Sequence, residues 1–443
     1  MSALAEFLDV TRRNRAGRSG VAMSVCSAHP LVLQALFRTA RRHDTFALVE
    51  STSNQVDQYG GYTGMTPAQF ARAVRERAAE EGFAEDRILL GGDHLGPNTW
   101  RARPAKEAMH ESLDLVSAYV AAGFGKIHLD ASFFCADDPR PLPEEEVADR
   151  CARMAERCEQ VRGNAAPVYV VGTEVPTPGG AREHEELRVT SPVEVGRTLE
   201  IFRAAFQRYG LEEAWERVVG LVVQPGVEFG DGMVHDYRPA PELARAILEH
   251  PGMVYEAHST DYQSPLALRQ LVQDHFCILK VGPWLTYALR EGLFLLELME
   301  RELAPSVPSR FRETLTQVMR DDPTHWNQHY GGSPEQISFK LAFSYSDRAR
   351  YYLGRREVQE AQQRLFRNLE PAIPETLVSQ FLPAEFLRVR GGEISPAPRE
   401  LVVERICGVM ELYMRAGAAP GPAPAASVSR SATTDASPQD PRC

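Results

Sequence analysis

Asp93 and His94 stand side by side in the segment GGDHLGPN, near the end of a short apolar run. A neutral imidazole is a common metal ligand, and a carboxylate beside it can act as a general base or support the ligand. On a regular strand, neighbouring side chains point to opposite faces, but Gly91, Gly92 and Gly96 permit a break at this point. The pair therefore predicts a carboxylate base next to a metal ligand.

His258 ends another apolar run, in YEAHSTDYQ, and is a candidate for the same metal site. Glu174, in the segment VYVVGTEV, is a candidate both for a ligand and for a catalytic carboxylate, and Gln224 is an alternative ligand. Histidine and carboxylate ligands around one open position are typical of catalytic zinc sites. The alternative is that these histidines are hydrogen-bonded core residues. We expect a divalent cation, Zn²⁺, with Mn²⁺ or Ni²⁺ as alternatives.

Lys280, in the run FCILKV, is one of only four lysines in the chain. A buried lysine with a lowered pKa can form a Schiff base, whereas a charged lysine pairs with a phosphate or a carboxylate. The acidic and histidine-rich segments favour a protonated lysine, so we expect charge pairing. Asp130, which follows KIHL, is a further catalytic candidate.

Residues that can bind a phosphate or a hydroxyl group follow several of these runs. In barrel enzymes, phosphate sites are usually found in the loops after the last two strands. Serine and threonine before a helix are also ordinary helix caps, which is the alternative interpretation. The candidate substrate- and phosphate-binding residues are Ser53, Asn54, Gly226, Ser259, Thr260, Asp261 and Gly282.

Eight short apolar runs must position these side chains, and amphipathic segments of helical length separate them. The expected strands are 21–26, 46–51, 87–93, 126–131, 168–174, 218–224, 253–258 and 276–281. Eight strand–helix units predict an α/β protein with a closed TIM (β/α)8 barrel, because an open sheet would leave two edges to protect. Other polar residues near the strand ends, which receive no role, include Cys26, Glu50, His128 and Glu256.

The chain of 443 residues is longer than a single barrel of about 250 residues requires. We expect the barrel in residues 1–303 and a helical extension, packed on the barrel, in residues 304–416. Residues 417–443 are rich in proline, alanine and serine and are expected to be a disordered tail.

Composition argues against several classes of protein. A net charge of −11 argues against a nucleic acid as the main partner. No apolar run approaches the ~20 residues that span a membrane, and the first residues lack the pattern of a signal peptide, so we expect a cytoplasmic protein. Seven cysteines without a CxxC pair argue against a disulfide framework or a structural zinc site.

A series of segments in the chain resembles one family. They are SVCSAHPLV, ESTSNQVDQYGGYTGMTP, GGDHLGPNTW, KIHLDAS, GTEVPTPGG, VVQPGVEF, YEAHSTDYQ and ILKVGP. Together they resemble the so-called non-catalytic subunit of D-tagatose-1,6-bisphosphate aldolase, the GatZ/KbaZ family, and the resemblance extends through YSDRARYYL to Ala416. This family is related to the class II, zinc-dependent aldolases, which implies a TIM barrel.

The resemblance implies roles for single residues. Asp93 resembles the base of the class II pattern, and His94 and His258 resemble zinc ligands. Asp130 corresponds to an aspartate at the mouth of the barrel, and Glu174 to a glutamate near the metal.

The resemblance places the phosphate-binding loops at Ser259-Thr260 and around Gly282. The sequence departs from the class II pattern at one metal ligand. The third zinc histidine of the catalytic class II aldolases precedes a Lys-Pro-Gly, and no histidine stands before Gln224-Pro225-Gly226. Glu174, Gln224 or water is expected to take its place.

The first of two functions implied by the resemblance is that of an enzyme. Some relatives look like metal-dependent 4-epimerases that interconvert D-tagatose 6-phosphate and D-fructose 6-phosphate, or the free sugars. A metal would bind the C2 carbonyl and C3 hydroxyl oxygens and stabilise an enediolate. A base would take the C4 hydroxyl proton, C3–C4 would cleave, and the aldehyde would rotate before the bond re-formed.

The second function is that of a non-catalytic accessory subunit for a class II D-tagatose-1,6-bisphosphate aldolase, in galactitol, N-acetylgalactosamine or tagatose catabolism. The cost of burying so many polar groups at one mouth favours the enzyme. We also expect a homo-oligomer. A kinase is not supported, because no GxxxxGK[ST] loop is present.

Overall fold

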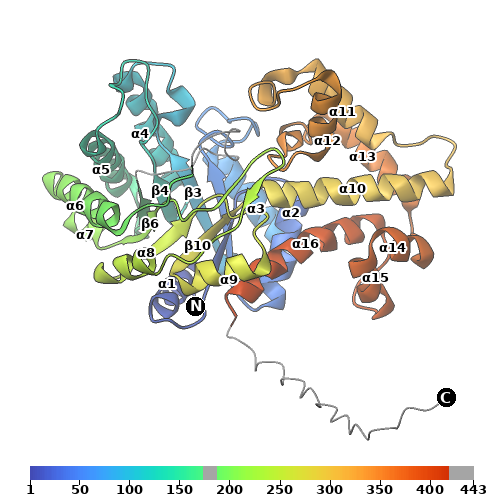
Figure 1. Ribbon diagram of the computed structural model, residues 1–443, viewed down its shortest axis with the longest axis horizontal. Coiled ribbons are helices and arrows are strands. Elements are labelled where there is room, and N and C mark those ends of the chain that lie inside the picture. The colour runs from blue at the N-terminus through green and yellow to red at the C-terminus, as the bar shows by residue number, and fades with distance from the viewer. Residues whose placement is uncertain (173–186, 419–443) are drawn as a thin grey trace, which may run out of the picture.

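The computed structural model describes residues 1–172 and 187–418, and its centre is a closed barrel of eight parallel strands (Figure 1). The TIM-barrel prediction is therefore confirmed, and each strand coincides with one of the eight runs. The strands are β1 (Ala22–Val25), β2 (Ala47–Thr52), β3 (Ile88–Leu95), β4 (Lys126–Leu129), β5 (Val168–Val171), β6 (Val218–Val222), β9 (Val254–Ala257) and β10 (Phe276–Val281). Two further strands, β7 (Glu228–Phe229) and β8 (Val234–His235), form a small antiparallel hairpin outside the barrel.

The barrel closes where the first strand meets the last. Ser24 on β1 lies beside Leu48 on β2 on one side and beside Lys280 on β10 on the other. The chain order runs around the barrel without a crossover, and β9 follows β6 directly. Because all eight strands are parallel, their carboxyl ends meet at one end of the barrel, which we call the mouth.

Helices after the strands form the outer ring, and prolines or capping residues begin most of them. Thr66 and Gln69 make a reciprocal capping box at the start of α3, and Ser191 and Glu194 make another at the start of α6. The ring helices are α2 (Pro30–Arg42), α3 (Pro67–Glu80), α4 (Ala105–Ala121), α5 (Glu144–Val161), α6 (Pro192–Arg208), α8 (Pro241–Ala246) and α9 (Pro265–Gln273). Shorter turns are η1 (Glu85–Arg87), η2 (Pro97–Trp100), α7 (Glu212–Trp215) and η3 (Ile247–Glu249).

The eighth position of the ring is filled by a helix from the far end of the chain. α10 (Pro283–Leu303) follows β10, but α16 (Pro398–Ala416) packs between α2 and α9. Figure 1 shows α16 running beside α10 and reaching back toward α9. The last described helix therefore completes the barrel that the first 303 residues begin.

Residues 304–416, here called the extension, are helical as the sequence predicts, and the helices α11 to α15 lie to one side of the barrel (Figure 1). They are α11 (Phe311–Asp321), α12 (Pro334–Phe343), α13 (Arg356–Leu369), α14 (Glu375–Phe381) and α15 (Pro383–Arg390), with the short turns η4 (Pro323–His325) and η5 (Arg348–Tyr351). The tail expected to be disordered lies, from residue 419, outside the described residues.

The end of the barrel opposite the mouth is apolar. α1 (Ala3–Arg15) packs there, and its buried Phe7 meets Phe46 edge to face with ring centroids 6.1 Å apart. Val170 and Ile278 belong to the same buried cluster. Apolar packing thus closes one end of the barrel, and the polar residues of the candidate site lie at the other end, the mouth.

No helix in residues 1–172 and 187–418 is long and apolar enough to cross a membrane. Six cysteines fall within these ranges, and all six are free thiols.

Candidate active site

Three histidines meet inside the mouth, and we call them the histidine cluster: His94 on β3, His128 on β4 and His258 directly after β9. All three are buried. The ring centroid of His94 lies 5.2 Å from that of His128 and 4.7 Å from that of His258. The remaining pair, His128 and His258, is 5.2 Å apart. Three separate strands thus bring three imidazoles to one point.

Each imidazole of the cluster also contacts a buried carboxylate. These contacts are His94 Nδ1 to Asp130 Oδ2 at 2.8 Å, His128 Nδ1 to Asp93 Oδ1 at 3.0 Å, and His258 Nε2 to Glu256 Oε1 at 2.9 Å. A carboxylate on one ring nitrogen orients a histidine and increases its basicity, and metal-bound histidines usually have such a partner.

The histidine cluster fits a divalent cation. The Nε2 atom of His128 is buried and has no hydrogen-bond partner among the described residues. Three imidazoles on one tetrahedral zinc ion, with Zn–N distances of about 2.0–2.1 Å, hold their ring centroids about 5 Å apart, as observed here. Donor atoms of Asp93, His128, Glu256 and His258 lie within 4.8 Å of one another; His94 is not in this group, although its ring centroid lies 4.7–5.2 Å from those of the other two imidazoles.

β3 is irregular at the site, and the irregularity turns Asp93 and His94 toward the same cavity. His94 has a φ of 48°, and the pairing of β3 with β4 shifts register between Gly92 and Leu95. Gly96 is required just beyond, because a Cβ atom there would lie 1.7 Å from the carbonyl oxygen of Asp130. The glycines on both sides of Asp93-His94 therefore permit this geometry, as the sequence suggested.

A network of buried charges lies directly below the histidine cluster, and we call it the ion network. Lys126 Nζ lies 2.6 Å from Glu50 Oε1 and 2.7 Å from Glu256 Oε2. Lys280 pairs with Glu50 and, at 2.9 Å, with Asp93 Oδ1. Lys126 Nζ makes no well-directed hydrogen bond to either glutamate, so attraction between charges dominates. The network links the barrel core to the carboxylate of Asp93.

The protonation states of the site follow from burial and from the neighbouring charges. Burial raises the pKa of Asp93, but the charge of His94 and the hydrogen bond to His128 outweigh burial and lower the pKa well below its usual range. Burial lowers the pKa of His94, yet the charge of Asp93 and the contact with Asp130 raise it to about 9. Burial lowers the pKa of Lys280 to about 8, so this lysine is charged at neutral pH.

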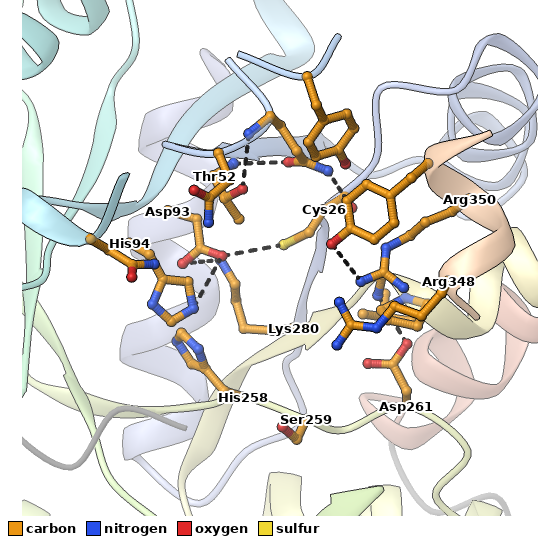
Figure 2. Close-up of a pocket in the computed structure, with 18 of the residues that line it drawn as sticks. Cys26, Thr52, Asp93, His94, His258, Ser259, Asp261, Lys280, Arg348 and Arg350 are labelled. Atoms are coloured by element: carbon orange, nitrogen blue, oxygen red, sulfur yellow. Dashed lines mark hydrogen bonds and ion pairs between the residues drawn. The ribbon is translucent and has the colours of Figure 1, made fainter. Parts of the chain in front are cut away.

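A cavity of about 340 Å³ lies above these groups and opens at the mouth (Figure 2). Asp93, His94, His258 and Lys280 form one wall, and Figure 2 shows Arg348, Arg350 and Asp261 across the cavity from them. Other lining residues are Cys26, Thr52, Asn54, Gln55, Tyr62, Asn98, Arg101, Phe133, Phe229, Ser259, Gln328, His329 and Tyr351, with Val281, Gly282 and Pro283 at the start of α10.

The structure brings most of the residues predicted from the sequence to this cavity. Those that line it are Asp93, His94, His258, Lys280, Asn54, Ser259, Asp261 and Gly282. Asp130 lies behind the wall and contacts His94. Four others do not line the cavity: Ser53, Thr260, Gly226 and Gln224. The hydroxyl of Ser53 donates to the carbonyl of His94, and that of Thr260 to the carbonyl of Lys280. The backbone N–H of Gly226 donates to the side-chain oxygen of Gln224. Glu174 lies outside the described residues.

Asp261 caps the first turn of α10. Its Oδ1 atom accepts hydrogen bonds from the backbone N–H groups of Gly282, at 3.0 Å, and Trp284, at 2.7 Å. Burial raises the pKa of Asp261 to about 6, because these backbone bonds only partly offset the loss of water. A carboxylate therefore occupies the helix terminus that the sequence assigned to a phosphate.

Asparagine at position 261 should stabilise the protein in a pH-dependent way. Because the pKa of Asp261 is higher in the folded protein, its protonated form contributes to the free energy of unfolding. This contribution is complete below the ordinary pKa of 3.8 and is lost as the pH rises through about 6. At pH 8 the ionised carboxylate therefore costs about 1–3 kcal/mol, which Asp261→Asn removes while keeping the acceptor oxygen. Urea unfolding at pH 4 and pH 8 measures this, and an equal difference between variant and wild type at both pH values would contradict it.

Several residues of the site were given no role from the sequence. Lys126 and His128 lie two residues apart, as do Glu256 and His258, so each pair points to the same face of its strand. The sequence placed His128 and Glu256 near the strand ends, and this alternation could have indicated a role for them beside His258. Arg348 and Arg350 carry no such signal, because they lie in the extension and only the tertiary fold brings them to the cavity.

Comparisons with known proteins find a family and several solved structures that resemble this chain. A family model described as D-tagatose-1,6-bisphosphate aldolase subunit GatZ/KbaZ-like matches residues 7–418. A crystal structure from Sinorhizobium meliloti 1021, described as a probable tagatose 6 phosphate kinase, is 45% identical, covers 89% of this chain and 100% of that chain, and has a TM-score of 0.84.

Two aldolase structures are more distant from this chain. Fructose-bisphosphate aldolase (Fba) from Campylobacter jejuni is 14% identical over 84% of this chain and 93% of that chain, with a TM-score of 0.46. The YdjI aldolase from Escherichia coli K12 is 9% identical over 79% of this chain and 94% of that chain, with a TM-score of 0.41.

Proposed function

The chain belongs to the GatZ/KbaZ-like family of D-tagatose-1,6-bisphosphate aldolase subunits, and on this premise we propose that it cleaves and re-forms a carbon–carbon bond of a ketohexose phosphate with the help of a divalent metal. The specific reaction is the 4-epimerisation that interconverts D-tagatose 6-phosphate and D-fructose 6-phosphate. The observation that carries the proposal is the histidine cluster beside Asp93, at the base of an open cavity.

The metal site consists of His94, His128 and His258, each oriented by its own carboxylate. His128 takes the place of the third histidine that has no counterpart before Gln224. Glu174, outside the described residues, remains a proposed additional ligand. Three nitrogen ligands with an open position suit Zn²⁺, and Mn²⁺ or Ni²⁺ are alternatives. A cation bound there would polarise the C2 carbonyl and C3 hydroxyl oxygens of the sugar and lower the cost of negative charge on them.

Asp93 is the proposed base. Its lowered pKa keeps it ionised, and it lines the cavity beside the histidine cluster. It removes the proton from the C4 hydroxyl group, C3–C4 breaks, and the C4 aldehyde rotates before C3 attacks its other face. Lys280, 2.9 Å from Asp93, positions the carboxylate and adds positive charge where negative charge develops.

The direct test is turnover by the purified full-length chain alone. D-tagatose 6-phosphate is mixed with the protein and with Zn²⁺, Mn²⁺ or Ni²⁺, and the sugars are followed by NMR. We expect D-fructose 6-phosphate to form with metal and not with EDTA. The absence of turnover with all three metals, also with the free ketohexoses and the bisphosphate, would refute the enzymatic proposal.

His128→Ala should weaken zinc binding by more than about 100-fold, because loss of an orienting partner alone costs 10- to 100-fold and this change removes a ligand. Zinc content after dialysis and competition with a chelator measure the effect. His110→Ala is the matched control, because the side chain of His110 is 78% exposed on α4. Full zinc occupancy in His128→Ala, or in His94→Ala, would remove that residue from the ligand set.

The second candidate is an accessory subunit, and the family description of an aldolase subunit favours it. In that role the chain would bind a separate catalytic class II aldolase chain and raise its stability and activity. Co-purification with that chain, together with no turnover by this chain alone, would support this function. A kinase is not proposed, although one similar protein is described as a probable kinase, because the sequence has no GxxxxGK[ST] loop.

A further inference from the structure

Two arginines of the extension line the cavity without an acidic partner. Arg348 is 5% exposed, and its Nε atom is buried without a hydrogen-bond partner. Within the described ranges, neither Arg348 nor Arg350 forms an ion pair with a carboxylate, whereas other arginines of the extension, such as Arg355, do. A buried guanidinium without a counter-ion is costly, so such a pair at a cavity wall indicates a site for an anionic ligand.

The nearest acidic residue in the sequence does not neutralise the pair. Asp347 turns away from the cavity, and its two oxygens bind Arg290 Nε on α10 at 2.8 Å and Thr286 Oγ1 at 2.6 Å. The segment that carries the arginines is therefore anchored on α10. The hydroxyl of Tyr262, after β9, also donates to the carbonyl of Tyr345 at 2.7 Å.

Contacts on the cavity side fix the guanidinium groups in place. Arg350 Nη2 lies 3.1 Å from the hydroxyl of Tyr351, whose ring meets that of Tyr62 edge to face at 4.8 Å. Arg348 Nη2 contacts His329 Nδ1 at 2.9 Å. The positions of both arginines are thus set before a ligand arrives, which reduces the entropy lost on binding.

The groups first assigned to a phosphate are already engaged. The backbone N–H of Gly282 donates to the carboxylate of Asp261, and the hydroxyl of Thr260 donates to the carbonyl of Lys280. A phosphate at this helix terminus would also meet the negative charge of Asp261. Three arginines that line the cavity form no ion pair among the described residues: Arg101, which is exposed, and Arg348 and Arg350, which lie across from the histidine cluster (Figure 2).

We propose that Arg348 and Arg350 bind the phosphate group of a phosphorylated ketohexose, while its reacting carbons lie at the histidine cluster and Asp93. Planar guanidinium groups match the geometry of phosphate oxygens and bind them with paired hydrogen bonds. The identity of the sugar rests on the proposed function, whereas the anion site rests on the two arginines alone. The site therefore selects a sugar phosphate over the free sugar.

Calorimetric titration of the full-length chain in EDTA, where no turnover is expected, tests this proposal. The probes are D-fructose 6-phosphate, D-fructose and inorganic phosphate, and the variants are Arg348→Ala, Arg350→Ala and both together. We expect each single variant to bind D-fructose 6-phosphate about 10- to 100-fold more weakly and to lose inorganic phosphate, with D-fructose unaffected. Arg356→Ala is the control, because that side chain is 84% exposed and pairs with Glu360 at the surface.

Unchanged affinity for D-fructose 6-phosphate in the double variant would overturn the proposal, and so would an equal loss for the phosphorylated and the free sugar. Thermal unfolding verifies that each variant is folded, and Arg348→Lys and Arg350→Lys, which keep the charge, serve if an alanine variant does not fold. Loss of phosphate binding in the variants, combined with no metal-dependent turnover by the wild type, would support the anion site and refute the epimerase.

Discussion

Asp93→Asn lowers the rate of D-tagatose 6-phosphate turnover by about 10²–10⁴-fold, the usual contribution of a positioned general base. Asparagine has almost the same shape and can still contact His128 and Lys280, which lie 3.0 and 2.9 Å from Oδ1 of Asp93. It cannot accept the proton of the C4 hydroxyl group. The rate of the metal-loaded protein, followed by NMR at saturating substrate, is the measurement.

The interpretation of this variant depends on two controls. Zinc content must be measured with the rate, because Asp93 is close enough to the other donors to be a ligand, and a loss of metal would explain the loss of rate differently. Asp114→Asn is the matched change at an exposed carboxylate on α4 and should have no effect. A wild-type rate in metal-loaded Asp93→Asn would exclude Asp93 as the base.

Lys126→Met should lower the free energy of unfolding by about 3–5 kcal/mol, the usual cost of removing one member of a buried ion pair. Lys126 is completely buried and lies between Glu50 and Glu256, at 2.6 and 2.7 Å. Methionine is similar in length, so the packing is largely kept while two carboxylates lose their counter-charge. Lys280 can neutralise only part of that charge. Urea unfolding followed by circular dichroism measures the loss.

A double variant separates charge from packing in this experiment. Lys126→Met combined with Glu256→Gln removes one positive and one negative charge, so we expect it to recover part of the lost stability. Lys106→Met, at an exposed position of α4, controls for the loss of a lysine as such. If the double variant is less stable than Lys126→Met alone, the uncompensated carboxylate is not the cause.

The barrel could be predicted because its signals are local. Each strand is a short apolar run, and prolines and capping residues such as Thr66 and Ser191 mark the helix starts that follow. Exact strand ends differ from the prediction, as at β3, which runs on to Leu95, because the irregular pairing near His94 does not end the strand. Local patterns determine which elements exist, whereas tertiary contacts determine where they stop.

The candidate site could be predicted only in part, because some of its contacts join distant parts of the chain. Asp93, His94, His258 and Lys280 follow from the rule that function lies at the carboxyl ends of barrel strands. Which of the many polar groups there approach one another depends on barrel geometry, which brings His128 to the other two histidines. The position of α16 within the ring could not be predicted either, because no pattern in its own sequence indicates that it packs against α2 and α9.

The place of α16 in the ring has a consequence for biosynthesis. Domains begin to fold from the amino end while the chain is still on the ribosome. Here all eight strands and the other ring helices emerge before α16, so the apolar groove between α2 and α9 stays open to water until residues 398–416 appear. In the nascent chain, the surfaces of α2 and α9 that α16 will cover are therefore exposed, and a chaperone can protect them. A premature stop codon before residue 398 would leave these surfaces exposed permanently and promote aggregation.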